Sequence, residues 1–169
     1  MSHGFLDLPL VGETRRNHAL EHATLHVLAA NRPGMPLAGH SNPTGFFILG
    51  NVQAAEVHAA AIEALRRLRA GERQLAIHPG CGTNLATTTL LAGTCAWLVL
   101  RGARSGWGRM MRLPIAIALA VAGVAISQPL GPAIQQQITT DAEMGSLQLV
   151  EVRPSLKGRI IAHRVITRA

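Results

Sequence analysis

The chain has 169 residues, 48% of them hydrophobic and only 15% charged, with a formal net charge of +7. This length suits one domain, or a smaller domain with a membrane anchor, and the excess of apolar over charged residues favours the second organisation. Two cysteines, Cys81 and Cys95, exclude a disulfide framework as the basis of the fold.

The first predicted element is a helix from Arg15 to about Ala30, after a loosely ordered lead-in of residues 1–13. Thr14 is expected to cap this helix, and Asn31-Arg32-Pro33-Gly34 is expected to end it, because a proline disfavours helix at the residue before it. The helix is amphipathic and carries histidines on one side.

His18, His22 and His26 recur at every fourth position and therefore share one stripe of this helix, with Glu21 at its edge. His18-x-x-Glu21-His22 has the H-x-x-E-H order of some zinc hydrolases. A catalytic zinc keeps three protein ligands and one position for water, and an unligated glutamate can accept the proton of that water. The pattern predicts His18 and His22 as Zn²⁺ ligands and Glu21 as the catalytic base. Arg15 or Arg16 could steady an oxyanion or an acidic substrate group.

A βαβ unit is predicted next, from a strand at residues 45–50, a helix at 51–70 and a strand at 74–78. Such a unit places its two strands parallel, with a right-handed crossover. Ligand-binding groups gather at the carboxyl ends of strands in α/β units. The turn 78–84, His-Pro-Gly-Cys-Gly-Thr-Asn, follows the second strand and is therefore a candidate for further metal ligands.

In this turn, His78 is the preferred third ligand and Cys81 the next, because His-x-x-Cys is a workable chelating spacing. The alternative is structural: Pro79-Gly80 makes the turn, and Cys81 is a small buried residue. His26 is another candidate ligand, or a hydrogen-bonding partner of the ligands. The other histidines are expected outside the site, His40 in a loop, and His58 and His163 solvated or interfacial.

Two charge-free stretches, Gly80–Leu100 and Leu113–Thr140, each reach the roughly 20 residues that cross a bilayer. We expect a transmembrane hairpin over residues 84–138, with Cys95 packed mid-span. Its linker, 101–112, has four arginines and no acid, which favours anionic lipid over nucleic acid as a partner. The arginines favour a cytoplasmic linker and external termini. The lack of an amino-terminal signal peptide instead favours a cytoplasmic soluble part, which we adopt.

Beyond the second span, residues 147–152 and 159–166 flank the turn 154–158 and predict a β-hairpin. The expected fold is therefore α+β: a small βαβ-containing soluble domain (1–83), the transmembrane helical hairpin (84–138), and a carboxy-terminal β-hairpin (139–169) that packs with the soluble domain.

Two resemblances add to these inferences. The five residues His18 to His22 are similar to the motif of the inverted zinc peptidases, the pitrilysin-like enzymes, which implies a distant glutamate, here Glu56 or Glu63, as third ligand. Those enzymes are much larger, so their fold does not carry over. Across residues 15–100, Arg-Asn-His-Ala-Leu-Glu-His-Ala-Thr, Gly-Phe-Phe-Ile-Leu-Gly and His-Pro-Gly-Cys-Gly-Thr-Asn together resemble an uncharacterised family of small bacterial integral membrane proteins.

The function that fits these features is a zinc-dependent hydrolase anchored in the bacterial inner membrane, of the metallopeptidase type, acting on a peptide or a membrane protein. The same histidines would also suit a non-catalytic metal- or haem-binding membrane protein. A structural membrane scaffold with a polar helix surface is the third alternative.

Overall fold

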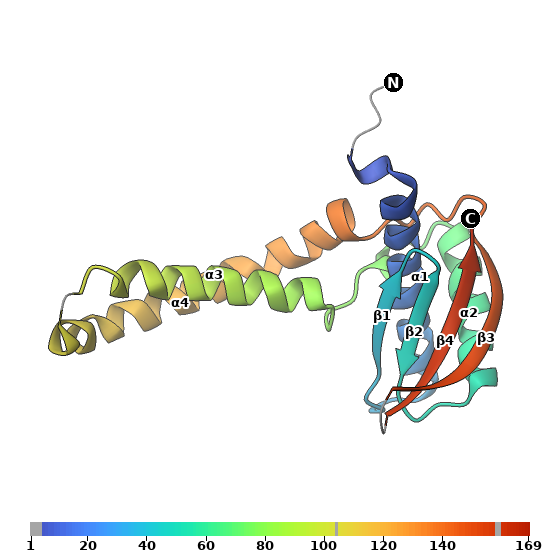
Figure 1. Ribbon diagram of the computed structural model, residues 1–169, viewed down its shortest axis with the longest axis horizontal. Helices are drawn as coiled ribbons and strands as arrows, with labels where there is room; N and C mark the ends of the chain where they lie inside the picture. The colour runs from blue at the N-terminus through green and yellow to red at the C-terminus, as the bar shows by residue number, and fades with distance from the viewer. Residues whose placement is uncertain (1–4, 104, 158–159) are drawn as a thin grey trace. The chain divides into compact units, whose positions relative to one another are not determined.

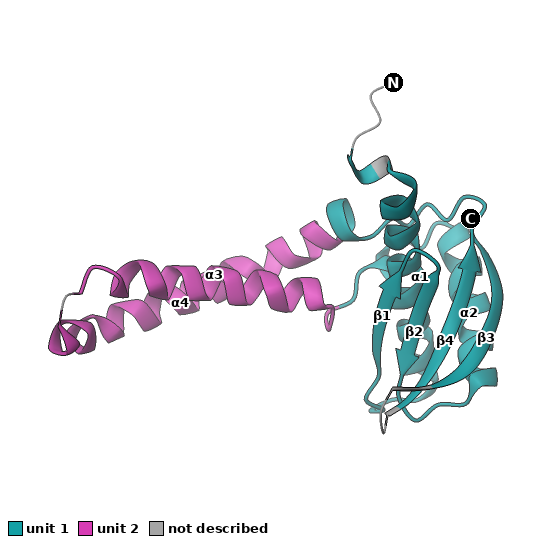
Figure 2. Cartoon of the chain, in the orientation of Figure 1, with its two compact units in different colours: residues 1–78, 136–169 teal, residues 79–135 magenta. Residues whose placement is uncertain are grey.

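The structure, a computed structural model, describes residues 5–103, 105–157 and 160–169. It divides into two compact units (Figure 2). Unit 1 combines residues 1–78 with 136–169, and unit 2 is the segment 79–135 between them. The sequence placed these two boundaries at 83/84 and 138/139.

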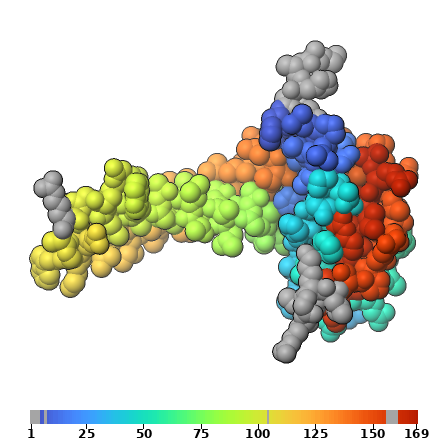
Figure 3. Space-filling model, in the orientation of Figure 1, coloured from blue at the N-terminus to red at the C-terminus, as the bar shows by residue number. Residues whose placement is uncertain are grey.

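Unit 1 contains a four-stranded sheet in the order β1-β2-β4-β3, in which every neighbouring pair is antiparallel. Helices α1 and α2 cover one face of the sheet (Figure 1). Figure 3 shows the other face, where β1, β2 and β4 reach the surface. The elements of this unit are η1 (Phe5–Asp7), α1 (Pro9–Asn31), β1 (Ala38–Asn42), β2 (Gly45–Leu49), α2 (Ala54–Arg69), η2 (Arg73–Ala76), β3 (Gln148–Lys157) and β4 (Ile160–Arg168).

The expected βαβ unit is wrong. Residues 73–76 form the 3-10 turn η2 instead of a strand, and β2 pairs with β1 and β4, both antiparallel. In the register with β4, Phe46 lies opposite Val165 and Ile48 opposite His163. The partner of β2 thus comes from the far end of the chain, so no parallel crossover is formed.

Three other predicted elements are confirmed: β2, α2 and the carboxy-terminal β-hairpin. The expected turn at 154–158 is wrong in its position, because β3 continues to Lys157. The histidine helix is also confirmed, but it begins at Pro9, so Thr14 lies inside α1. Part of the expected hairpin, at residues 158–159, lies outside the described residues. Strand β1 was not expected, and it includes His40, which is exposed there and not in a loop.

Between α1, α2 and the sheet lies a core of aliphatic side chains around Phe46, with Leu20 and Val165 fully buried beside it. A polar side chain, Asn17, is also fully buried. Its amide nitrogen donates to the carbonyls of Asn42 and Pro43 at 3.0 and 2.9 Å, and its oxygen accepts from Thr167 Oγ1 at 2.6 Å. Because burial of an unpaired amide is costly, these bonds pin α1 to the β1–β2 turn and to β4.

Unit 2 is a pair of helices, α3 (Gly82–Leu100) and α4 (Gly106–Ile134), with η3 (Gln135–Thr139) following α4 across the boundary with unit 1. Small and polar residues make the contact between the two helices. A Cβ on Gly123 would lie 3.1 Å from backbone atoms of α3, and Thr88 and Ser127 share a hydrogen bond of 2.7 Å. In the first turn of α3, Asn84 Oδ1 accepts a hydrogen bond from Gln135 Nε2 at 2.6 Å.

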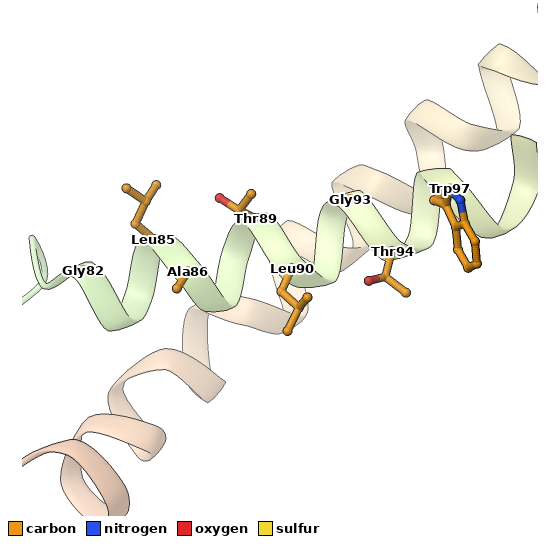
Figure 4. A pocket seen from close by; sticks show the side chains of 8 residues that line it. All are labelled: Gly82, Leu85, Ala86, Thr89, Leu90, Gly93, Thr94 and Trp97. Carbon is orange, nitrogen blue, oxygen red and sulfur yellow. The ribbon is translucent and has the colours of Figure 1, made fainter.

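Large apolar side chains of unit 2 point outward. Leu85, Leu90 and Trp97 line an open groove along α3 (Figure 4), and their exposed fractions are 70%, 71% and 57%. Helix α3 and the helical stretch Gly106–Thr139, which comprises α4 and η3, are each long and apolar enough to cross a membrane.

Candidate metal centre

The histidine stripe of α1 lies against the chain around η2 and the end of η3. His18 and His22 stack with their ring centroids 4.3 Å apart. His22 is 1% exposed, so its ring belongs to the interior of the structure. The helical spacing of four residues is what brings the two rings together.

Hydrogen bonds to backbone carbonyls select the tautomer of all three rings on the stripe. His18 Nδ1 donates to Thr139 O at 2.9 Å, and His22 Nδ1 donates to Ala76 O at 2.7 Å. His26 uses its other nitrogen, Nε2, to donate to Ile77 O at 2.8 Å. A carbonyl oxygen can only accept, so these nitrogens carry the proton. In the neutral rings the lone pair is then on Nε2 of His18 and His22, and on Nδ1 of His26.

His78 joins the stripe from the segment after η2. Its ring centroid lies 5.6 Å from that of His22 and 5.1 Å from that of His26. Burial, and to a smaller extent the charges of His22 and His26, lower the pKa of His78 from 6.5 to about 4. His78 is therefore neutral at pH 7, the form in which an imidazole binds a metal ion.

Arg15 holds the segment that supports His18. Its guanidinium donates to the carbonyls of Gln137 and Thr140, both at 3.1 Å, and its own carbonyl accepts from the backbone N–H of Asp141 at 3.1 Å. Thr139 lies between these hydrogen-bonded residues, so its carbonyl is held in position to accept from His18 Nδ1. Arg15 also lines a polar cavity of about 210 Å³. The sequence offered Arg15 only as a group that binds substrate, and the positioning of Thr139 was missed.

Glu21 lies on the side of the histidine stripe that faces β1. Its side chain is 4% exposed, and Ser41 Oγ on β1 donates to its Oε2. The rest of the carboxylate lies directly against the backbone of Gly39, where no Cβ would fit. A glycine in β1 thus makes room for the glutamate, and a serine two residues later orients it.

The donor set of His18 and His22 fits a metal ion. One ring nitrogen of each lies within 4.8 Å of the other. Zinc binds imidazole nitrogens at 2.0–2.1 Å, so two tetrahedral ligands are roughly 3.4 Å apart, and small ring rotations would bring both nitrogens to one ion. Metal-binding histidines usually donate their second nitrogen to a carbonyl or carboxylate, as both do here.

Three further candidate ligands were named from the sequence: Cys81, Glu56 and Glu63. Cys81 caps the amino end of α3 in unit 2, where its sulfur accepts from Thr83 N at 3.4 Å, and its ligation of a metal stays a prediction. The glutamates implied by the resemblance to zinc peptidases, Glu56 and Glu63, pair with Arg32 and Arg66 at the surface.

Two further histidines can be compared with their expected positions. His58 is exposed on α2, as expected. The expectation for His163 is wrong, because its ring is 4% exposed and its Nε2 donates to Val52 O at 2.8 Å. His163 lies opposite Ile48 in the register, on the side of β4 that faces the core.

Asn17, Ser41 and Gly39 support the site and were missed by the sequence reasoning. Asn17 directly precedes His18, and this position beside the motif was the one available signal. Gly39 and Ser41 lie in a Pro- and Gly-rich stretch that resembled a loop, and only the pairing of β1 with β2 brings them to Glu21.

Sequence comparison places the chain in a family. Residues 13–152 match the family described as "Domain of unknown function (DUF6391)", so the chain belongs to that family. It is also 37% identical over 152 residues to an uncharacterized protein of the cyanobacterium Picosynechococcus sp. (strain ATCC 27264 / PCC 7002 / PR-6), covering 82% of this chain and 71% of that protein. No solved structure matches the chain.

Proposed function

We propose that the protein is a membrane-anchored, metal-dependent hydrolase that acts on peptide bonds, with zinc as its metal. The single observation that carries this proposal is the pair His18 and His22, whose Nδ1 atoms donate to backbone carbonyls. Both rings are thereby preset to present Nε2 to a metal ion, and a buried carboxylate, Glu21, lies between them in the sequence.

In this proposal His18 Nε2 and His22 Nε2 would hold the ion, and His78 would supply the third imidazole. The ion would supply Lewis-acid chemistry there, lowering the pKa of a bound water and polarising the carbonyl group of a substrate. Glu21 accepts the proton of the attacking water and later passes it to the leaving amine. The hydrogen bond from Ser41 to Oε2 orients the carboxylate for this transfer.

The anchor is unit 2. The length and hydropathy of α3 and α4 support a transmembrane hairpin. The outward direction of Leu85 and Leu90 supports it further, because these side chains would be costly to expose to water. The hydrolytic site in unit 1 would then work at a membrane surface, on peptides or on membrane proteins.

The test uses purified protein in detergent, loaded with zinc, and fluorescently labelled casein as the peptide probe. We expect Glu21→Gln to keep its zinc and to lose at least about 100-fold in hydrolysis, the usual contribution of a general base. His58→Ala, on the exposed side of α2, should change neither quantity. Hydrolysis that survives Glu21→Gln would contradict the role of Glu21, and zinc-loaded protein without hydrolysis of casein would contradict the peptidase.

A second candidate, a metal-binding protein without catalysis, is favoured by one observation. Glu21 is buried and its carboxylate is engaged by Ser41 and packed against Gly39, so it could serve only to stabilise α1 against β1. In that case Glu21→Gln would lower the temperature of thermal unfolding of the metal-loaded protein, with no hydrolysis in the wild type to lose.

A further inference from the structure

The connection between α3 and α4 concentrates positive charge at one end of unit 2. We call residues 97–112 the hairpin tip. It contains four arginines, and no aspartate or glutamate occurs anywhere between Glu72 and Asp141. Unit 2 therefore has no carboxylate side chain of its own to neutralise these arginines.

Three of the tip arginines are described, and all are exposed: Arg101, Arg109 and Arg112. Arg101 lies over the ring of Trp97, with its Cζ 4.8 Å from the ring centroid. Arg112 donates to Val99 O at 3.1 Å, which caps a carbonyl near the end of α3. Each guanidinium has five N–H donors, so these contacts leave donors for an outside acceptor.

Two tryptophans share this end of the helix pair. Trp97 lies in the last turn of α3 and Trp107 in the first turn of α4, and they are 57% and 69% exposed. Trp and Tyr are enriched at the level of lipid headgroups, because one part of the ring system is apolar and another donates a hydrogen bond. Both tryptophans of the chain are in this one place.

We propose that the hairpin tip is a binding site for anionic phospholipid headgroups, which Arg101, Arg109 and Arg112 hold through their phosphates while Trp97 and Trp107 lie at headgroup level. This inference rests on the membrane anchoring in the proposed function, but it does not depend on metal binding or hydrolysis. Charge complementarity carries it, since the only charges in unit 2 are positive and all lie at the tip.

Nucleic acid would also attract a basic tip, but the neighbouring surface favours lipid. Met110 and Met111, between the arginines, are 57% and 61% exposed, and Leu113 directly after Arg112 is 44% exposed. A polyanion in water would leave this apolar surface wet, whereas lipid covers it. Long arginine side chains can lie along such a surface and keep their charge at the headgroups.

The test reconstitutes the full chain in phosphatidylcholine vesicles with a trace of spin-labelled phosphatidylglycerol or spin-labelled phosphatidylcholine. Electron paramagnetic resonance then gives the fraction of each label that is immobilised on the protein. We expect wild type to prefer phosphatidylglycerol about fivefold, the factor for roughly 1 kcal/mol from an arginine at the surface, and to lose most of this preference in 1 M NaCl.

The triple variant Arg101→Gln, Arg109→Gln, Arg112→Gln should bind both labels about equally, and replacement of the same three residues by Lys should keep the preference. A matched control, Arg32→Gln, Arg66→Gln, Arg153→Gln, removes the same charge from ion pairs on the surface of unit 1 and should keep the preference too. Vesicles washed at alkaline pH should retain every variant.

Equal binding of the two labels by wild type, or an equal loss of preference in the control variant, would overturn the proposal. If wild type shows no headgroup preference and its tip arginines bind a labelled single-stranded oligonucleotide, the ligand of the hairpin tip is nucleic acid and not lipid.

Protein removed by the alkaline wash would overturn the membrane anchoring, and this site with it. Protein that is retained but shows no headgroup preference would overturn this site alone. The salt dependence of wild type tests the proposal even if the triple variant fails to fold.

Discussion

The two units bury opposite kinds of residue. In unit 1, Leu20 and Phe46 are fully buried, and the polar side chains inside, such as Asn17, are hydrogen-bonded. In unit 2, Leu85 is 70% exposed, while Gly123 and Ser127 lie buried between the helices.

This difference fits the proposal that unit 2 is anchored in a membrane. Water drives apolar side chains inward, whereas helices in lipid gain nothing from that and associate through small residues and shared hydrogen bonds. The contact of Gly123 with α3 and the bond between Thr88 and Ser127 are of this second kind. These contacts are what the proposed membrane anchor in unit 2 predicts, whereas the core of unit 1, which carries the histidines, is of the first kind.

The largest expected difference between the units is in the cost of replacing a leucine by alanine. Leu20→Ala leaves a cavity in the core of unit 1 and should cost about 2–5 kcal/mol of stability. Leu85→Ala, on the outside of α3, should cost close to nothing. Thermal unfolding in detergent, followed by circular dichroism, measures both variants, and equal losses would contradict the assignment of inside and outside.

Removal of a buried polar side chain should also cost more stability in unit 1 than in unit 2. Asn17→Ala removes three hydrogen bonds and leaves buried partners unpaired, which should cost about 2–3 kcal/mol. Ser127→Ala removes one bond between α3 and α4 and should cost about 0.6 kcal/mol, as found for such bonds in membranes. The same thermal measurement tests both, and a larger loss for Ser127→Ala would reverse the comparison.

The variant Gly39→Ala should show whether the position of Glu21 matters for hydrolysis without affecting metal binding. Gly39→Ala cannot fit against Glu21, so the carboxylate must move away from its position beside Ser41. We expect a loss of about 1–3 kcal/mol in stability, retention of the metal, and loss of hydrolysis in parallel with Glu21→Gln. Gly34→Ala is not a suitable control because of its positive φ, whereas Gly82→Ala, with open space around it, is suitable. Unchanged hydrolysis in Gly39→Ala would show that the position of Glu21 is unimportant.

The smallest effect concerns an exposed ion pair. The backbone N–H of Gln53 and the guanidinium of Arg32 lower the pKa of Glu56 below its usual 4.5. A depressed folded pKa stabilises the fold above about pH 4.5, and this contribution is lost as the pH falls through the folded pKa. The difference in unfolding temperature between wild type and Glu56→Gln should therefore be small at pH 7 and vanish at low pH. A difference that grows as the pH falls would contradict this sign.

The sequence predicted the histidine helix, β2, α2 and the carboxy-terminal hairpin, because each has a local signal in its apolar spacing and its turn residues. It failed at residues 74–78, where Leu75 and Ile77 alternate as in a strand but form a short 3-10 turn and its end. Alternation over so few residues does not separate these two structures. It also failed at β1, whose residues Ala-Gly-His-Ser-Asn have low strand propensity and are a strand only because β2 pairs with them.

The sequence predicted the candidate site in part. The spacing of His18 and His22 predicted their proximity, and the turn after η2 predicted that His78 would meet them. The carbonyls that fix the rings, from Ala76 and Thr139, carry no signal in side-chain identity. They belong to segments far from α1 in the sequence, so only the folded chain shows them.

The most direct test of the metal centre is elemental analysis of detergent-purified wild type beside His22→Ala, with His58→Ala as control. We expect about one zinc ion per chain in wild type and in His58→Ala, and almost none in His22→Ala. Equal metal content in wild type and His22→Ala, or no metal in any of the three proteins, would contradict a metal centre at His18 and His22.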